Sequence, residues 1–382
     1  MLSSVFAKNT QKNTDGRITN VICNSAKQGL IPQREYFDKD IANSDNTNGY
    51  YIIEENDFVY NPRKSSDAPY GPISSYKYTE AGIVSPLYLC FRAKKEINPA
   101  FFEWYFRSSA WHRYVYMSGD SGARHDRVSI KDDTFFAMPI NIPSAHEQAQ
   151  IANFLERIEQ RIETQRALVD SLKKYKRGVV RTLLSPDSCC IEETTWTTAK
   201  IGDLGSFTKG APLSKADITP DGTPFILYGE LYTTYHEVIN SVIRRTKAQP
   251  EKQYYSHVGD VIIPTSGETP EEISTAACVM LPDIILAGDL NIFRSSKIDG
   301  RIMSYILNHI VNGQIARIAQ GKSVVHIQAS EISKIEISYP DYNTQCKMIS
   351  VFETVGARIK SAENELTYLR TMQKALLQQL FI

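Results

Sequence analysis

The segment that decides the fold runs from Pro143 to Leu184, PSAHEQAQIANFLERIEQRIETQRALVDSLKKYKRGVVRTLL. Its seam positions follow one another in alternating steps of four and three residues: Ile158, Ile162, Gln165, Val169, Leu172, Lys176, Val179 and Leu183. This alternation is the period of a coiled-coil seam, because two turns of such a helix advance seven residues. The segment is therefore predicted to form a long helix that packs along a second helix.

A second segment repeats the first with a shift of 197 residues and no gap. It begins after Pro340 and has the same steps at Val355, Ile359, Ala362, Leu366, Leu369, Gln373, Leu376 and Leu380. Two unrelated core helices could share a heptad by chance, but the unbroken register favours a true repeat. We predict two helices of about 34 residues, each roughly 50 Å long at about 1.5 Å per residue. Thr344 replaces the acid Glu147, so a weaker cap is expected at the second helix.

A globular unit precedes each helix. Both units are rich in Tyr, Ile, Val, Gly and Pro, in short runs bounded by turn signals, which predicts strands with few helices. Weaker matches between the units pair 56–62 with 259–265, 103–106 with 303–306, and 121–124 with 320–323. The expected organisation is a domain at 1–145, a helix at 146–184, a second domain at 185–342 and a final helix at 343–382.

Composition narrows the class of protein. The 382 residues contain 43 basic and 43 acidic side chains, so contact with nucleic acid would depend on local patches. The start is too short and polar for a signal peptide, and no apolar run approaches the roughly 18 residues of a membrane span. The six cysteines form no Cys-x-x-Cys pair, and we expect reduced thiols in a cytoplasmic protein.

Motifs for catalysis are missing. The sequence has no His-Glu-x-x-His and no Gly-x-Gly-x-x-Gly, so neither a metal site nor a cofactor loop is predicted. The stretch Asp67-Ala68-Pro69-Tyr70 matches three of the four positions of the Asp-Pro-Pro-Tyr motif of adenine methyltransferases. Without a glycine-rich loop nearby, we interpret it as a proline turn with an exposed tyrosine.

Basic and polar loops are the candidates for binding DNA. Arg, Asn, Gln and Ser read base edges, while Lys and Arg neutralise phosphates. Each loop alone could be a solvated surface, but recurrence in both units favours function. The candidate residues are Asn61, Arg63, Lys64, Ser65, Arg124, His125 and Arg127 in the first unit, and Lys209, Thr265, Ser266, Glu268, Lys322, Ser323 and His326 in the second.

The first helix also has a basic end. These basic side chains could follow a phosphate backbone, stay solvated or contact a partner protein. The seam on the same helix slightly favours contact with a partner protein. The cations of this basic end are Lys173, Lys174, Lys176, Arg177 and Arg181.

The order of globular unit and long helix, twice, resembles the specificity subunit of type I restriction-modification systems over essentially the whole chain. The residues that carry the resemblance are 60–65, 82–88, 111–114, 122–127, Ile142-Pro143 with Glu147-Gln148, and 201–204. The resemblance implies an α+β fold: two target recognition domains with mixed β-sheets, joined by two long antiparallel coiled-coil helices in a pseudo-twofold internal repeat.

The same resemblance implies a function. Each domain would read one half of a bipartite double-stranded DNA site, and the helices would dock two methyltransferase subunits. Restriction and translocase subunits would complete the complex, with S-adenosylmethionine, ATP and magnesium on those partners and no catalytic centre in this chain. Two rivals are a methyltransferase or restriction enzyme fragment with fused recognition domains, and a coiled-coil scaffold that binds no DNA.

Overall fold

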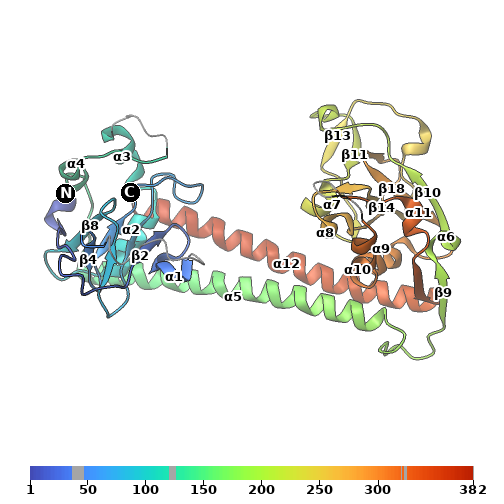
Figure 1. Cartoon of the computed structure of the whole chain (residues 1–382), viewed down its shortest axis with the longest axis horizontal. Coiled ribbons are helices and arrows are strands. Elements are labelled where there is room, and N and C mark those ends of the chain that lie inside the picture. The colour runs from blue at the N-terminus through green and yellow to red at the C-terminus, as the bar shows by residue number, and fades with distance from the viewer. Residues whose placement is uncertain (37–46, 120–125, 320, 322–324, 382) are drawn as a thin grey trace. The chain divides into compact units, whose positions relative to one another are not determined.

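The computed structural model describes residues 1–36, 47–119, 126–319, 321 and 325–381. The chain divides into two compact units, one formed by Met1–Arg166 with Asn364–Ile382, the other by Ala167–Glu363. Each unit contains one globular domain and a part of both long helices (Figure 1). Among the described residues, no helix combines the length and the apolar character that a membrane span requires.

The long helices are α5 (Ala145–Leu183) and α12 (Tyr342–Leu380). A reciprocal cap opens α5, because the Ser144 amide donates to Glu147 Oε2 at 2.9 Å and the Glu147 amide donates to Ser144 Oγ at 3.3 Å. At α12 the acid and the hydroxyl exchange places. The amide and hydroxyl of Thr344 donate to the two oxygens of Asp341 at 3.0 and 2.9 Å. The second helix is therefore capped as well, with Asp341 supplying the acid that position 344 lacks.

Part of the predicted seam packs between the two helices, whereas Leu380, which the heptad also placed in the seam, is exposed. In the first unit, Ile158 and Ile162 of α5 form a buried cluster with Leu369 of α12, joined by Leu366, Met372 and Leu376. Arg161 Nη2 donates to Glu365 Oε1 at 2.7 Å beside this cluster. In the second unit, Lys173 Nζ lies 2.7 Å from Glu363 Oε1. Later positions of α5 thus meet earlier positions of α12, which makes the helices antiparallel.

The domain of the first unit is built on an antiparallel sheet. Its strand order is β1 (Phe6–Lys8), β8 (Leu89–Ala93), β5 (Phe58–Tyr60), β6 (Ile73–Ser75). Two further antiparallel pairs are β2 (Ile22–Ser25) with β3 (Gly29–Pro32), and β4 (Tyr51–Ile53) with β7 (Gly82–Val84). The helices before α5 are α1 (Gln33–Tyr36), α2 (Pro99–Arg107), α3 (His112–Ser118) and α4 (Asp132–Phe136), with a 3-10 turn at Leu2–Ser4.

Aromatic side chains fill the core of this domain. The ring of Phe6 meets the rings of Phe58, Phe91 and Phe102 edge-on, with centroids 5.0 to 5.3 Å apart. The end of α12 joins the same core, because Phe381 packs on Phe101 with ring centroids 5.4 Å apart. Aromatic pairs in this geometry add to the stabilisation from buried area. The domain is therefore fixed to the end of the second long helix.

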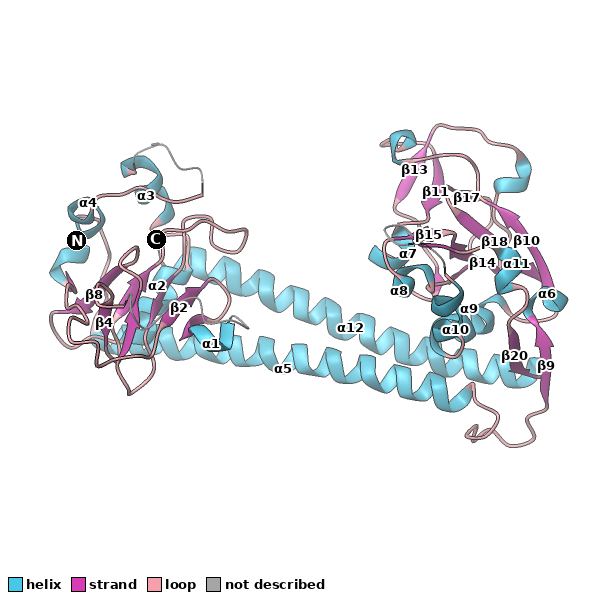
Figure 2. Cartoon of the chain, viewed as in Figure 1, coloured by secondary structure: helices cyan, strands magenta, loops and turns pink. Residues whose placement is uncertain are grey.

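The domain of the second unit has mixed sheets (Figure 2). The larger sheet has the order β10 (Gly205–Lys209), β18 (Leu290–Ser295), β14 (Asp260–Pro264), β16 (Ala277–Val279), β12 (Val238–Ile239). A smaller sheet has the order β13 (Arg244–Thr246), β11 (Thr223–Leu227), β17 (Ile285–Ala287). The β12–β16 and β11–β17 pairs are parallel and the others are antiparallel.

Short elements complete the second unit. Two antiparallel pairs are β9 (Trp196–Lys200) with β20 (Glu336–Pro340), and β15 (Ser266–Gly267) with β19 (Val325–His326). The helices are α6 (Ile201–Leu204), α7 (Glu230–Thr233), α8 (Pro270–Ile273), α9 (Gly300–His309), α10 (Asn312–Ile318) and α11 (Ala329–Ile332), with 3-10 turns at Lys215–Asp217 and Lys252–Tyr254.

A pair between a buried aspartate and a partly exposed arginine recurs in both domains. Arg92 on β8 donates to both carboxylate oxygens of Asp57 at 2.6 and 2.7 Å, and Arg294 on β18 does the same to Asp260 at 2.7 and 2.6 Å. Both aspartates follow a residue with positive φ, Asn56 at 68° and Gly259 at 95°. Bidentate pairs of this kind fix a single geometry. The 56–62 and 259–265 segments, matched by sequence, therefore open equivalent strands.

Candidate nucleic-acid interface

In the first unit, main-chain hydrogen bonds join the two loops that sequence singled out. The loop after β5 forms an antiparallel bridge with the segment that precedes α4, between Arg63 and Arg127. The Lys64 amide donates to Asp126 O at 2.8 Å, and the Val128 amide donates to Pro62 O at 2.9 Å. Two loops that are far apart in sequence thus form one surface.

Asn61 holds this loop in shape. Its side-chain oxygen accepts the Arg63 amide at 3.1 Å, and its side-chain nitrogen donates to Asn24 O at 3.2 Å. This turn is a common use of asparagine after a strand. Because both ends of the side chain are engaged, Asn61 positions Arg63 rather than presenting its own amide to a ligand.

Cationic side chains remain accessible on the first loop pair. Arg63 and Lys64 are exposed, and the side chain of Arg127 is 30% exposed, with Nε 3.9 Å from Asp126 Oδ2. Ser65 is also exposed, although its hydroxyl accepts the Ala68 amide at 3.1 Å. Arg124 and His125 lie outside the described residues. The described part of this surface can offer two guanidinium groups and one ammonium group to an anionic partner.

The second unit repeats the arrangement with different side chains. Its β15–β19 pair sets Ser266 opposite His326 and Gly267 opposite Val325. The Ile327 amide also donates to Thr265 O at 3.0 Å. The loop after β14 is therefore joined to the segment after α10, as the loop after β5 is joined to the segment after α3. Lys322 and Ser323 lie outside the described residues.

The side chains of the second loop pair divide into positioning and accessible groups. Ser266 is 5% exposed and donates to Asp289 Oδ2 at 2.7 Å, so it stabilises the loop instead of offering its hydroxyl to DNA. Thr265 is half-buried, whereas Glu268 and His326 are exposed. The exposed groups are an acceptor and an imidazole, in contrast to the arginines and lysine of the first unit.

Lys209 lies beside this loop pair at the end of β10. Its Nζ donates to Asn291 Oδ1 at 2.8 Å, across the β10–β18 ladder. Burial lowers the pKa of Lys209, and the nearby Asp289 carboxylate opposes that effect. Among the described residues, Asn291 Nδ2 is buried without a hydrogen-bond partner. Lys209 is thus held by Asn291 and feels the charge of Asp289, the residue that anchors Ser266.

Two interpretations of the sequence need correction. Tyr70 is not an exposed tyrosine, because it is half-buried and its ring lies 4.6 Å from that of His112. Lys176 does not belong to a solvated or partner-facing run, because its Nζ is 2.6 Å from Glu237 Oε2 and its side chain is 17% exposed. Both side chains instead fix the domains internally.

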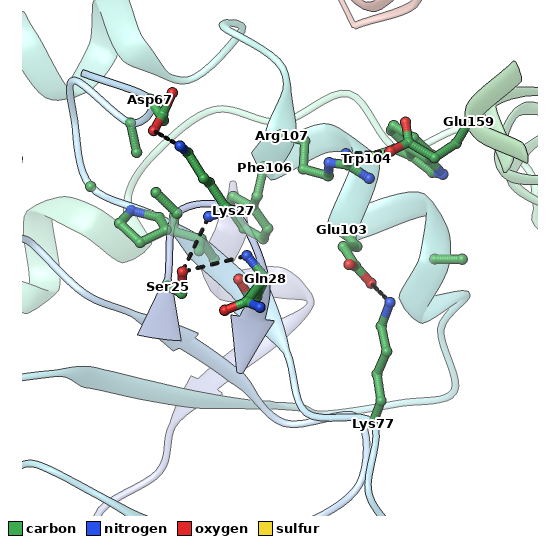
Figure 3. Close-up of a pocket in the computed structure, with 18 of the residues that line it drawn as sticks. Ser25, Lys27, Gln28, Asp67, Lys77, Glu103, Trp104, Phe106, Arg107 and Glu159 are labelled. Carbon is green, nitrogen blue, oxygen red and sulfur yellow. Dashed lines mark hydrogen bonds and ion pairs between the residues drawn. The ribbon is translucent and has the colours of Figure 1, made fainter. Parts of the chain in front are cut away.

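A cleft of about 590 Å³ in the first unit was not indicated by sequence (Figure 3). It lies among the β2–β3 turn, α2 and α5, which are distant in sequence. Its cations are each paired with an acid, Lys27 with Asp67 at 3.6 Å, Lys77 with Glu103 at 3.0 Å, and Arg107 with Glu159 at 3.3 Å. Because those charges are neutralised internally, the cleft lacks the excess of cations that binds a phosphate backbone.

Neither a metal nor a catalytic cluster is evident in the part of the chain that the structure describes. No group of three or more His, Cys, Asp or Glu side chains in that part is arranged to hold a metal ion. The repeated feature is instead a pair of joined loops on a rigid sheet, present once in each domain.

Two α+β domains of one design, each followed by a long helix, define a duplicated recognition protein. The chain matches the type I restriction modification DNA specificity domain twice, over residues 6–174 and 193–370, and it belongs to this family. It is therefore a DNA specificity subunit of the type I restriction-modification class, a non-catalytic family. No curated protein is detectably similar to it in sequence.

Solved structures share the fold. A chain from a study of complex assembly and conformational transition of the type I restriction-modification system is similar with a TM-score of 0.67 and 14% identity, over 99% of this chain and 95% of that one. The S subunit of the type I restriction-modification system from M. genitalium is similar with a TM-score of 0.55 and 14% identity, over 100% of this chain and 95% of that one. The HsdS subunit from Thermoanaerobacter tengcongensis is similar with a TM-score of 0.52 and 14% identity, over 100% of this chain and 95% of that one.

Proposed function

We propose that each domain reads one half of a bipartite double-stranded DNA site and that the paired helices dock two methyltransferase subunits. The observation that carries this proposal is the pair of joined loops found in both domains. The same scaffold holds Arg63, Lys64 and Arg127 in the first unit but Glu268 and His326 in the second. A common scaffold with different side chains suits two readers of different sequences.

The proposal assigns chemistry to the partners. Methylation and cleavage belong to methyltransferase and restriction or translocase subunits, which bind S-adenosylmethionine, ATP and magnesium. This chain binds none of these cofactors and acts in the cytoplasm with the DNA that it reads. The purified chain, incubated with DNA and labelled S-adenosylmethionine, is expected to transfer no methyl group. Transfer that persists through repurification would instead support a fused methyltransferase.

The test of the two-reader proposal is the methylation pattern of cells that express this chain with its methyltransferase subunits. Sequencing of modified bases is expected to give one motif with two defined segments and a fixed undefined spacer. A single continuous motif would contradict two separate readers. Loss of all modification when this chain is omitted is the matching control, because the methyltransferase subunits then have no specificity subunit.

A further inference from the structure

Two large apolar side chains on α3 are exposed to solvent. Tyr116 is 71% exposed and Met117 is 73% exposed, the highest values for large apolar side chains in the described part of the chain. The helix is anchored by Trp111, the residue that precedes it, and by Val115, which are each 1% exposed. Single exposed apolar residues are ordinary, but two neighbours that are both more than 70% exposed mark a contact surface.

The end of α3 lies beside the first loop pair. The Gly119 amide caps the helix by donating to Val115 O at 2.8 Å. A Cβ atom at Gly119 would lie 3.1 Å from Ser129 O, so this end of the helix is in close contact with the segment that follows Arg127. That segment is joined to the loop of Arg63 through Val128 and Pro62. The apolar pair and the cationic loop pair are therefore adjacent parts of one domain.

The corresponding helix of the second unit lacks this feature. The buried anchors Trp111 and Val115 at α3 correspond to Val311 and Ile315 at α10, which are 2% and 0% exposed. The positions after Ile315 are Ala316 and Arg317, where α3 has Tyr116 and Met117. The scaffold is shared but the exposed apolar pair is not. A feature needed for folding or for equivalent partner subunits would be expected in both units, so the pair belongs to what distinguishes the two readers.

The surrounding charge favours DNA as the occupant. Arg113 is exposed one turn before the pair, and Arg63 and Lys64 are exposed on the adjoining loop. In such an arrangement the cations can contact DNA phosphates while the apolar side chains contact the edge of a base. In the major groove, the apolar group available for such contact is the C5-methyl of thymine.

We propose that Tyr116 and Met117 recognise a thymine in the half-site of the first unit through its C5-methyl group. This inference rests on the proposed function. The inference adds to the proposed function one recognised base, thymine, and one recognised chemical group, its C5-methyl. The two apolar side chains would favour a methyl group over a hydrogen at C5.

The test replaces thymine by deoxyuridine, which removes only that methyl group. The full chain, assembled with its methyltransferase subunits, is titrated with duplexes that carry deoxyuridine at one position of the first half-site at a time. One position is expected to weaken binding about fourfold, the equivalent of about 0.8 kcal/mol for one buried methylene. In a Tyr116→Ala, Met117→Ala double variant, the same replacement is expected to have no effect.

The matched control is Ile243→Ala, which removes a 58% exposed apolar side chain from the second unit. This variant is expected to keep the sensitivity to deoxyuridine in the first half-site. The proposal is overturned if no position responds, if the double variant responds as the unaltered chain does, or if the first half-site holds no thymine. Binding to the second half-site is recorded in parallel, so a failed thymine contact is distinguished from a chain that does not read DNA.

Discussion

Glu237 joins the first long helix to the domain of the second unit. Its carboxylate accepts Lys176 Nζ of α5 at 2.6 Å and contacts His309 Nε2 of α9 at 2.8 Å. Burial alone would raise the pKa of Glu237, but the hydrogen bond from His309 and the charge and hydrogen bond of Lys176 outweigh it and lower the pKa to about 2. The carboxylate therefore stays ionised in the folded protein over most of the acidic range.

Replacing this carboxylate should destabilise the second unit in a pH-dependent way. A lowered pKa in the fold contributes stability above the ordinary value of 4.5, and that contribution is lost as the pH falls toward 2. Glu237→Gln is expected to lower the free energy of unfolding by about 3 kcal/mol at pH 7, because Lys176 would remain buried without its partner. Denaturant unfolding of both chains at pH 7 and at pH 3 measures this difference, which should shrink at the lower pH. Glu268→Gln, at an exposed position, is the control and should be neutral.

Arg63 is the side chain most suited to test base reading in the first unit. If it makes a bidentate contact with guanine, Arg63→Ala is expected to cost about 1–3 kcal/mol in binding and to relax one position of one half-site. A phosphate contact would instead weaken all sequences alike and lower the salt slope by about one. Competition binding at several salt concentrations separates the two cases. Arg17→Ala, at an 85% exposed side chain of the same unit, should change neither quantity.

The long helices are the elements that sequence predicts best. A heptad seam of this length specifies a helix almost without tertiary context, and the observed α5 and α12 each begin one residue before the expected 146 and 343. The cap of α12 was missed for a physical reason. Reading position 344 alone suggested a lost acid, whereas Asp341 supplies the acid and accepts both the amide and the hydroxyl of Thr344.

Tertiary contacts explain what periodicity could not predict. Lys176 occupies a seam position but reaches Glu237, which precedes β12 by one residue and cannot be located from α5 alone. The joined loops were recognised as candidates because they recur, yet their main-chain pairing depends on the sheet that brings them together. The exposure of Tyr116 and Met117 was equally invisible, because an apolar pair on a short helix is usually assigned to the core.

The helix seam itself is open to a direct test. Leu369 is 8% exposed and packs with Ile158 and Ile162 in the first unit. Leu369→Asp is expected to lower the free energy of unfolding by about 3 kcal/mol or more, because it removes a buried leucine and buries a charge. Thermal unfolding of the full chain followed by circular dichroism measures the loss. Thr371→Asp, at an exposed position two residues later, should leave the transition almost unchanged; equal losses would contradict a packed seam.

At the scale of the whole molecule, duplication separates what is shared from what is specific. The aspartate–arginine pair, the glutamine that follows each helix cap and the joined loops occur in both units. Gln148 Nε2 donates to Pro143 O at 2.9 Å, and Gln345 Nε2 donates to Pro340 O at 2.8 Å. These contacts are internal and set backbone geometry. The exposed side chains on the loops are the part that differs, which is what two readers on one scaffold require.

Independent reading by the two units is the remaining prediction. Each loop pair is built from strands and main-chain contacts of its own unit, so substitutions in one should not alter the other. We expect Arg63→Ala to relax only one half of the methylated motif and His326→Ala to relax only the other. The free-energy costs should add in the double variant to within about 0.5 kcal/mol. Methylome sequencing of cells that carry each variant with its methyltransferase subunits gives the motif, and binding measurements give the energies. If either single variant changed both halves, the two domains would have to read the DNA jointly.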